Sequence, residues 1–219
     1  MTDGILIVNK PKGVTSHDVV DVIRRKFNIK RVGHAGTLDP LATGVLIILL
    51  GKATALSESF MSEDKEYIAT IHIGKKTDTQ DSTGKVIEEK AIDGLDIDSV
   101  NKALASFLGE TQQIPPMVSA KKYKGKKLYK LARKGITVER KPCNIKISEI
   151  ELLDFKLPEI TIRVKCSKGT YVRTLCEDIG NRLDYPSHMS ALTRSASGRF
   201  TLKEALDLDR INEKDIQTT

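Results

Sequence analysis

The most constraining feature of this sequence is a glycine-rich stretch that leads directly into an apolar run. Residues 33–44 read Gly-His-Ala-Gly-Thr-Leu-Asp-Pro-Leu-Ala-Thr-Gly, and residues 45–50 read Val-Leu-Ile-Ile-Leu-Leu. Glycine and proline at this density predict a loop, because they interrupt both helices and strands. The uninterrupted apolar run predicts a buried strand. The sequence therefore predicts a loop that is carried on a strand of the core.

Asp39 is the only acidic residue of this loop. Pro40 lacks an N–H and disfavours helical geometry at Asp39, so the carboxylate can be presented at a turn. The glycines at positions 33, 36 and 44 permit positive φ or the close approach of another chain segment. An aspartate before a proline is also a common turn former. The loop alone therefore leaves a structural turn and a reactive carboxylate as alternatives.

Composition sets only broad limits on the class of protein. The chain has 219 residues, 39% hydrophobic and 30% charged, which is typical of a soluble globular protein of one large or two small domains. Its net charge of +7 is compatible with a polyanionic partner. Cys143, Cys166 and Cys176 show no metal or disulfide spacing and predict reduced thiols. With no signal peptide or membrane span in the sequence, we expect a cytoplasmic protein without membrane association.

Hydrophobic patterning predicts alternating strands and helices. Ser16 is predicted to cap a helix through Phe27, and Asp98 is predicted to cap a helix with apolar residues at 100, 104, 107 and 108. Lys10 and Lys12 stand in a Pro/Gly turn, where lysines are commonly solvated. Strands are predicted at residues 5–8, 45–50, 66–73, 86–88, 145–155, 159–166 and 190–195.

A strongly basic window covers residues 115–146. It holds eleven Lys or Arg and one acid, Glu139, so its net charge of +10 exceeds that of the whole chain. Tyr123 and Tyr129 are interleaved with the lysines. A run of this kind is either a solvated face or an arm that contacts phosphates, and phosphate contacts need charge and reach more than sequence precision. We interpret it as a phosphate-binding arm.

Several strings together resemble the bacterial tRNA pseudouridine-55 synthase (TruB) family. They are Val-Asn-Lys-Pro-Lys-Gly-Val-Thr-Ser (8–16), the loop and strand at 33–46, Ile-Pro-Pro-Met-Val-Ser-Ala-Lys-Lys-Tyr-Lys-Gly-Lys-Lys-Leu-Tyr (114–129) and Gly-Thr-Tyr-Val-Arg-Thr-Leu (169–175). They occur in the order found in the family, and the resemblance covers nearly all of residues 4–200. The first string resembles a motif that buttresses the catalytic loop, and the third resembles the family's thumb insertion.

The resemblance implies a fold and a reaction. The implied fold is α/β (α+β): a mixed, largely antiparallel central sheet flanked by helices, in one domain over residues 1–219. A basic thumb-like insertion is expected at about 112–146, and no additional C-terminal domain. The implied reaction converts the T-loop uridine at tRNA position 55 to pseudouridine, without cofactor, metal or obligatory protein partner, in a monomer.

The resemblance also assigns roles in the reaction centre. Asp39 would be the nucleophile, attacking either C6 of the base or C1′ of the sugar. Arg173 would pair with Asp39 and keep it ionised and oriented. Tyr67 would stack on the flipped uracil and could serve in proton transfer.

The remaining assigned residues would hold the RNA. The target base must leave its stack and be received by an aromatic face. Tyr171 would line the base pocket, Leu192 would pack under the base, and His34 would enter the vacated stack. The basic arm would hold the RNA backbone through Lys121, Lys122, Lys124 and Lys126.

Two other functions stay open at this stage. A guide-RNA-dependent synthase of the archaeal and eukaryotic type shares the Asp39 motif and would depend on guide RNA and partner proteins. A non-catalytic tRNA-binding folding factor would keep the basic arm and tolerate loss of Asp39. An Asp/His hydrolase is disfavoured, because no second acid or metal-binding set accompanies Asp39.

Overall fold

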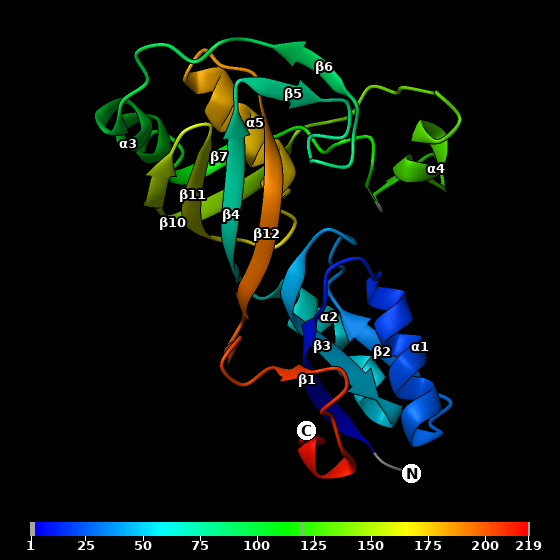
Figure 1. The fold of residues 1–219 in the computed structure, drawn as a ribbon. Helices are drawn as coiled ribbons and strands as arrows, with labels where there is room; N and C mark the ends of the chain where they lie inside the picture. The colour runs from blue at the N-terminus through cyan, green and yellow to red at the C-terminus, as the bar shows by residue number, and fades with distance from the viewer. Residues whose placement is uncertain (1–2, 120, 219) are drawn as a thin grey trace. The chain divides into compact units, whose positions relative to one another are not determined.

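The computed structural model describes residues 3–119 and 121–218, without the side chain of Lys122. It divides into two compact units, drawn as a ribbon in Figure 1. Unit 1 comprises Met1–Ile68 and Ala191–Thr219, and unit 2 comprises Ala69–Ser190. Two long strands, β4 (Lys65–Ile73) and β12 (Ser187–Ser197), have residues in both units.

Unit 1 is built around the apolar run identified in the sequence. This run forms strand β3, and the hydrogen-bonded strand order in the unit is β14-β1-β3-β12, with β2 also paired to β3 and β13 to β12. The elements of unit 1 are β1 (Gly4–Lys10), α1 (Ser16–Phe27), β2 (Val32–Ala35), β3 (Thr43–Leu50), the 3-10 helix η1 (Gly51–Leu56), α2 (Ser57–Ser62), β13 (Phe200–Thr201), β14 (Leu206–Asp207) and the 3-10 helix η2 (Glu213–Asp215).

The core of unit 1 follows the two-residue period of its strands. Alternate residues of a strand point to the same face, so Val45, Ile47 and Leu49 of β3 pack on one side with Ile5 and Ile7 of β1. All residues from 45 to 50 are 0% exposed. The predicted buried strand is confirmed, and the loop before it starts from a rigid support.

Helix α1 begins one residue away from the predicted cap. Its N-cap is Thr15, whose hydroxyl accepts from the Asp18 backbone N–H while the Asp18 carboxylate accepts from the Thr15 N–H. The prediction that Ser16 is the cap is therefore wrong. Ser16 is buried in the first turn of the helix, where its hydroxyl is available to another segment.

Unit 2 contains the longest strand and the basic arm. The strand order here is β12-β4-β11-β10-β7, and β5 pairs with β6 in a small separate sheet. The elements of unit 2 are β5 (Lys75–Thr77), β6 (Val86–Glu89), α3 (Ile97–Ala105), β7 (Gly109–Gln113), β8 (Lys122–Tyr123), β9 (Lys126–Lys127), α4 (Leu128–Ala132), β10 (Cys143–Lys156), β11 (Glu159–Cys166) and α5 (Val172–Arg182).

Helix α3 differs from its predicted limits at both ends. Its N-cap is Asp96, which accepts from the Ser99 N–H at 2.7 Å, so the prediction of Asp98 as cap is wrong. The helix ends at Ala105, and Leu108 beyond it is 50% exposed. Two aspartates two residues apart both match the capping preference, and the apolar spacing did not distinguish between them.

The pairing directions show the predicted fold class. The pairs β1–β3, β2–β3, β10–β11, β7–β10 and β12–β13 are antiparallel, whereas β1–β14 and β3–β12 are parallel. Helices α1 and α2 contact β2, and α3 contacts β10. The prediction of a mixed, largely antiparallel sheet with flanking helices is confirmed.

Candidate active site

Asp39 lies half-buried on a loop that hydrogen-bonds to the turn and helix start at residues 13–16. The Gly13 N–H donates to the Pro40 carbonyl at 2.8 Å. The Ser16 hydroxyl accepts from the Leu38 N–H at 2.8 Å and donates to the Leu38 carbonyl at 3.1 Å. These contacts show how the turn and helix start at residues 13–16 buttress the loop on either side of Asp39. Fixed backbone positions restrict where the carboxylate can point.

Lys10 is fully buried beside this loop, unlike the solvated lysines that are common in such turns. Its side chain is 0% exposed, and its ammonium donates to the carbonyls of Pro11 at 2.9 Å and Val14 at 2.8 Å. Burial lowers the pKa of Lys10 to about 8, partly offset by the negative charge of Asp39. Lys12, in the same turn, is exposed. Lys10 thus places a cation within the electrostatic reach of Asp39 and closes the turn.

His34 comes from the short strand β2 at the other end of the loop. Its Nδ1 is buried and makes no hydrogen bond within the described residues. Burial lowers the pKa of His34, and the positive charge of Arg194 lowers it further. The imidazole is therefore neutral at pH 7.

Tyr67 and Leu192 also belong to unit 1. Tyr67 lies half-buried on β4, two residues after Lys65, whose ammonium donates to the carbonyls at the end of α2. Leu192 is 8% exposed on β12, and its carbonyl accepts from the Thr43 hydroxyl at 3.4 Å. Unit 1 therefore holds four of the predicted site residues: His34, Asp39, Tyr67 and Leu192.

Arg173 lies in unit 2, in the first turn of α5, and is 5% exposed. Its guanidinium forms an ion pair with Asp81 at 3.4 Å and donates to the Val118 carbonyl at 2.9 Å. Asp81 is itself held, because its other carboxylate oxygen accepts from the hydroxyls of Thr79 and Thr83. The structure thus fixes Arg173 by a buried network, and its pairing with Asp39 stays a prediction.

Tyr171, the N-cap residue of α5, is fixed by a side chain far away in sequence. Gln113 donates from Nε2 to the Tyr171 carbonyl at 3.1 Å, and its Oε1 accepts from the Tyr171 N–H at 2.8 Å. Gln113 is 4% exposed. Sequence reasoning missed both Gln113 and Asp81. Asp81 stands in a Thr-x-Asp-x-Thr string, which is the signal that could have marked a hydroxyl-supported carboxylate.

The basic arm forms a hairpin, β8–β9, followed by the single turn of α4. Lys121, Lys124 and Lys126 are exposed, and the side chain of Lys122 lies outside the described part of the structure. The interleaved tyrosines carry cations on their faces, with Lys124 5.6 Å from the Tyr123 ring centre and Arg133 5.4 Å from that of Tyr129. The arm therefore presents cations supported by aromatic rings.

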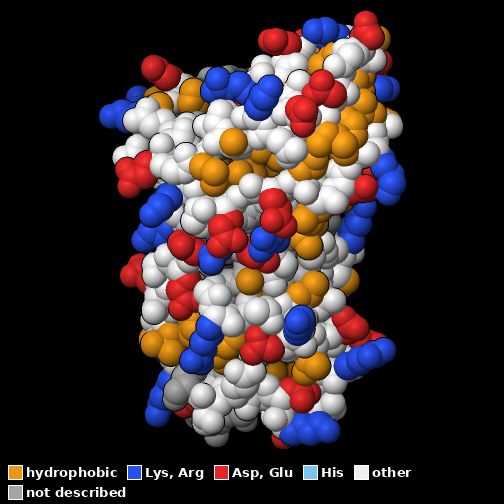
Figure 2. Space-filling model, turned by 90° about the vertical axis from the view of Figure 1, so that its left-hand side faces the viewer, with side chains coloured by type: hydrophobic (Ala, Val, Ile, Leu, Met, Phe, Trp, Pro, Cys, Tyr) orange, Lys and Arg blue, Asp and Glu red, His pale blue; other side chains and the backbone are white. Residues whose placement is uncertain are grey.

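One face of the protein is mixed in charge. On the face drawn in Figure 2, acidic and basic side chains are interspersed. Surface pairs such as Arg163 with Glu151 at 3.0 Å contribute to this pattern. The charge excess of the arm is therefore a local feature of the sequence rather than a property of the whole surface.

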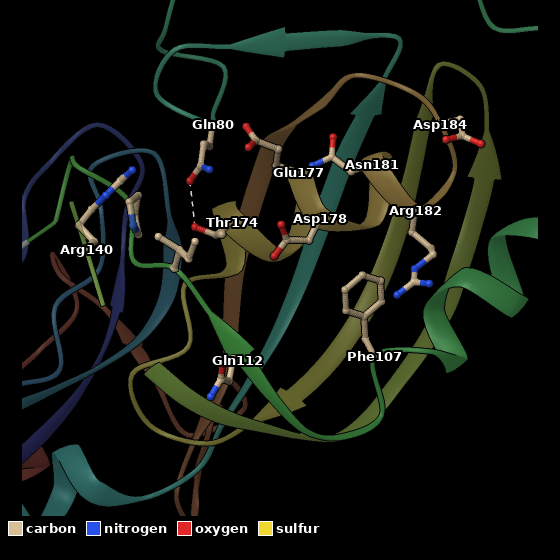
Figure 3. A pocket seen from close by; sticks show the side chains of 12 residues that line it. Gln80, Phe107, Gln112, Arg140, Thr174, Glu177, Asp178, Asn181, Arg182 and Asp184 are labelled. Atoms are coloured by element: carbon tan, nitrogen blue, oxygen red, sulfur yellow. Dashed lines mark hydrogen bonds between the residues drawn. The ribbon is translucent and has the colours of Figure 1, made fainter. Parts of the chain in front are cut away.

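A cavity of about 780 Å³ lies within unit 2 beside α5 (Figure 3). Thr174 donates to Gln80 at 2.9 Å on its wall, and the Arg182 guanidinium lies 6.0 Å from the Phe107 ring centre. Burial, together with the negative charge of the neighbouring Glu177, raises the pKa of Asp178 to about 6. Both signs of charge line this cavity, so it does not resemble a phosphate site.

Within residues 3–119 and 121–218, no three His, Cys, Asp or Glu side chains are grouped so that they could hold a metal ion. None of the helices in the described chain is both long and apolar enough to cross a membrane. The three cysteines are free thiols.

The sequence matches the models of two known protein domains. Residues 24–172 match the model of the N-terminal domain of the TruB family of pseudouridylate synthases. The chain belongs to this family. Residues 173–218 match the model of the C-terminal domain of tRNA pseudouridylate synthase B. The family's members are isomerases that act on uridine, so this TruB-family chain is an enzyme of that class.

Related proteins can be aligned with nearly the whole of this TruB-family chain. The tRNA pseudouridine synthase B of Opitutus terrae is 51% identical over 95% of this chain and 87% of its own length. That of Syntrophotalea carbinolica is also 51% identical, over 95% of this chain and 68% of its own. Among solved structures, a Cbf5-Nop10-Gar1 complex matches 98% of this chain at 29% identity with a TM-score of 0.77. This chain spans 60% of that one.

Proposed function

We propose that this protein converts the uridine at position 55 of the tRNA T loop into pseudouridine, with Asp39 as nucleophile. The reaction breaks the N1–C1′ bond and forms a C5–C1′ bond. C5 loses a proton and N1 gains one, so no electrons enter or leave. A carboxylate suits the covalent step because it can both add and leave, whether it attacks C6 or C1′.

The proposal rests on how the structure holds the loop that carries Asp39. It is the only acid on a loop that is held by Gly13, Ser16 and a fully buried strand. Lys10 provides a buried positive charge within its electrostatic reach. A fixed carboxylate beside cations stays ionised and directed, as a nucleophile requires.

The other predicted residues complete the proposed site. Arg173, oriented by Asp81, pairs with Asp39 and holds its carboxylate in line. Tyr67 stacks on the extruded uracil and takes part in proton transfer, and Leu192 packs under the base. Tyr171 lines the same pocket, and its backbone is already fixed by Gln113.

The RNA is proposed to be bound by shape and by charge. His34 is neutral and has an unused buried nitrogen, so it can enter the stack left by the flipped base without adding charge. The arm holds the phosphate backbone through exposed lysines. We propose that the protein works as a cytoplasmic monomer, in one catalytic domain with a thumb-like insertion, and needs neither a cofactor nor a protein partner.

The direct test is incubation of the purified protein with an unmodified tRNA transcript, followed by mapping of pseudouridine. Wild type should modify position 55 and no other uridine. Asp39→Asn should bind the same tRNA within threefold and form no product, because the amide keeps the shape but is not a nucleophile. Turnover of Asp39→Asn at a tenth of the wild-type rate or more would remove Asp39 from the mechanism.

The same experiment decides between the alternative functions. The solved Cbf5 neighbours share 27–29% identity with this chain, against 51% for the two bacterial relatives. We therefore expect activity without guide RNA or added proteins. Product only after these are supplied would favour the guide-dependent function. Binding with no product from the wild type under any condition would favour a folding factor.

A further inference from the structure

Arg194 is a deeply buried arginine that contacts the loop carrying Asp39. It lies on β12 within unit 1 and is 1% exposed. Its Nε donates to the Val45 carbonyl at 2.6 Å, and its NH2 group donates to the Gly36 carbonyl at 3.1 Å. These two carbonyls stand on opposite sides of Asp39 in the sequence. One side chain thus joins both ends of the loop that carries Asp39.

The backbone of Arg194 contacts the same loop. Arg194 is the register partner of Gly44 in the β3–β12 pair. Gly44 has a φ of +99°, and a Cβ at this position would lie 2.3 Å from the Arg194 carbonyl oxygen. A Cβ on Gly36, whose φ is +90°, would lie 3.5 Å from an Arg194 nitrogen, in ordinary contact with it. The positive φ favours glycine at both positions, and at Gly44 the close Arg194 backbone also leaves no room for a side chain.

A purely structural account of this residue is weak. A buried guanidinium loses its hydration, and an apolar side chain of similar volume often stabilises a fold as well or better. Its two bonds reach neutral carbonyl oxygens, which orient the guanidinium without neutralising its charge. The positive charge of Arg194 acts on groups beside the loop, because it lowers the pKa values of Lys10 and His34. What an apolar side chain cannot do is hold two loop carbonyls at once.

We propose that Arg194 is a positioning residue for Asp39, whose two-carbonyl clamp fixes the loop from Gly36 to Val45 in the reacting conformation. The inference rests on the proposed function, since it assumes that Asp39 is the nucleophile. A nucleophile displaced by about 1 Å can lose a factor of about 100 in rate. The effect of losing the clamp should therefore appear in the chemical step.

The test uses the full chain and an unmodified tRNA transcript under single-turnover conditions with excess enzyme. Arg194→Met should lower the rate constant about 100-fold. Arg194→Lys keeps the charge but its single ammonium cannot span both carbonyls, so we expect a loss of about tenfold. Gly44→Ala keeps the Arg194 side chain but adds a Cβ that clashes with the Arg194 backbone and displaces the loop. We expect its rate constant to fall at least about tenfold. RNA affinity should stay within threefold in all three.

The reaction amplitude separates positioning from folding. A residue that only stabilises the fold would lower the melting temperature and the fraction of active enzyme, while the active molecules keep the wild-type rate constant. Rate constants of Arg194→Lys and Arg194→Met within threefold of wild type would overturn the inference. If Arg194→Met does not fold, Arg194→Lys and Gly44→Ala decide by the same criterion. Wild type and Asp39→Asn are run alongside, so an inactive wild type would instead refute the proposed function.

Discussion

The Asp81–Arg173 pair offers the sharpest test of how unit 2 holds its predicted catalytic arginine. The side chains are 7% and 5% exposed, and the carboxylate accepts from two threonine hydroxyls as well as from the guanidinium. Asp81→Asn keeps the size and one acceptor oxygen. It removes the negative charge and can turn an N–H₂ donor toward the donors of Arg173. The buried guanidinium of Arg173 then loses the negative charge of Asp81, which holds it within unit 2.

The expected loss of stability follows from burial. Removing one partner of a buried pair costs about 3–5 kcal/mol, because the remaining charge is desolvated. Since asparagine preserves part of the network, we expect about 3 kcal/mol for Asp81→Asn. For a chain of this size, that corresponds to a fall in melting temperature of roughly 6–12 °C. Because Arg173 is the proposed partner of Asp39, the single-turnover rate should also fall at least about tenfold.

Urea titration followed by circular dichroism measures the change as a shift in midpoint at constant slope. Glu151→Gln is the matched control, because Glu151 pairs with Arg163 at 3.0 Å in the same unit while the two side chains are 49% and 35% exposed. Exposed pairs contribute about 0–1 kcal/mol, so this variant should stay near wild type. An Asp81→Asn variant that loses no more than Glu151→Gln would refute the argument from burial.

Two further predictions concern charge. Replacing the four arm lysines with glutamine should lower the slope of log K against log salt by about 0.7–0.9 for each lost phosphate contact, and an unchanged slope would mean that the arm is only a solvated face. These lysines are Lys121, Lys122, Lys124 and Lys126. Asp178 binds its proton more tightly in the folded state, with a pKa of about 6, so its contribution to stability falls as pH rises from about 4 to 6. Asp178→Asn should remove that fall and be more stable than wild type at pH 7, as measured by urea midpoints across this range; equal pH profiles would contradict it.

Local patterns in the sequence predicted the elements well. The apolar run at 45–50 and the strand at 159–166 appear at or within two residues of the predicted limits, because hydrophobic burial and β-branched composition are local signals. The fold class was also correct, but it was implied by the resemblance to the TruB family and not by these local patterns. The cap of α1 was misplaced by one residue because Thr15 and Ser16 are both good capping residues. Choosing between them requires knowing that the Ser16 hydroxyl is bound to Leu38.

Long-range partners could not be predicted from the sequence. Lys10 looks like a solvated turn lysine until β1 and the turn after it enclose it. Asp81 and Arg173 are separated by 92 residues, and Gln113 and Tyr171 by 58. No periodicity links such pairs, because they meet only through the sheet order. The resemblance to the TruB family named Arg173 and Tyr171, but the groups that orient them became visible only in the fold.

The two halves of the proposed site are held separately, which leads to a last prediction. Ser16 fixes the Asp39 loop within unit 1 through Leu38, and Asp81 fixes Arg173 within unit 2. Within the described residues, these hydrogen bonds of Ser16 and Asp81 go to different partners. Ser16→Ala should cost about 1–3 kcal/mol, because it leaves the buried N–H and carbonyl of Leu38 unpaired. Its effect on stability should add to that of Asp81→Asn within about 0.5 kcal/mol, as expected for sites without common partners.

The effects of the same two changes on rate should not add. If Asp39 and Arg173 act as one pair, misplacing either member already removes most of what the pair supplies, so the double variant should be little slower than the slower single variant. Urea midpoints and single-turnover rates on the four proteins measure both cycles. Fully multiplicative losses in rate would show that Asp39 and Arg173 act in separate ways. A stability coupling above about 1 kcal/mol would show that the two anchors are not independent.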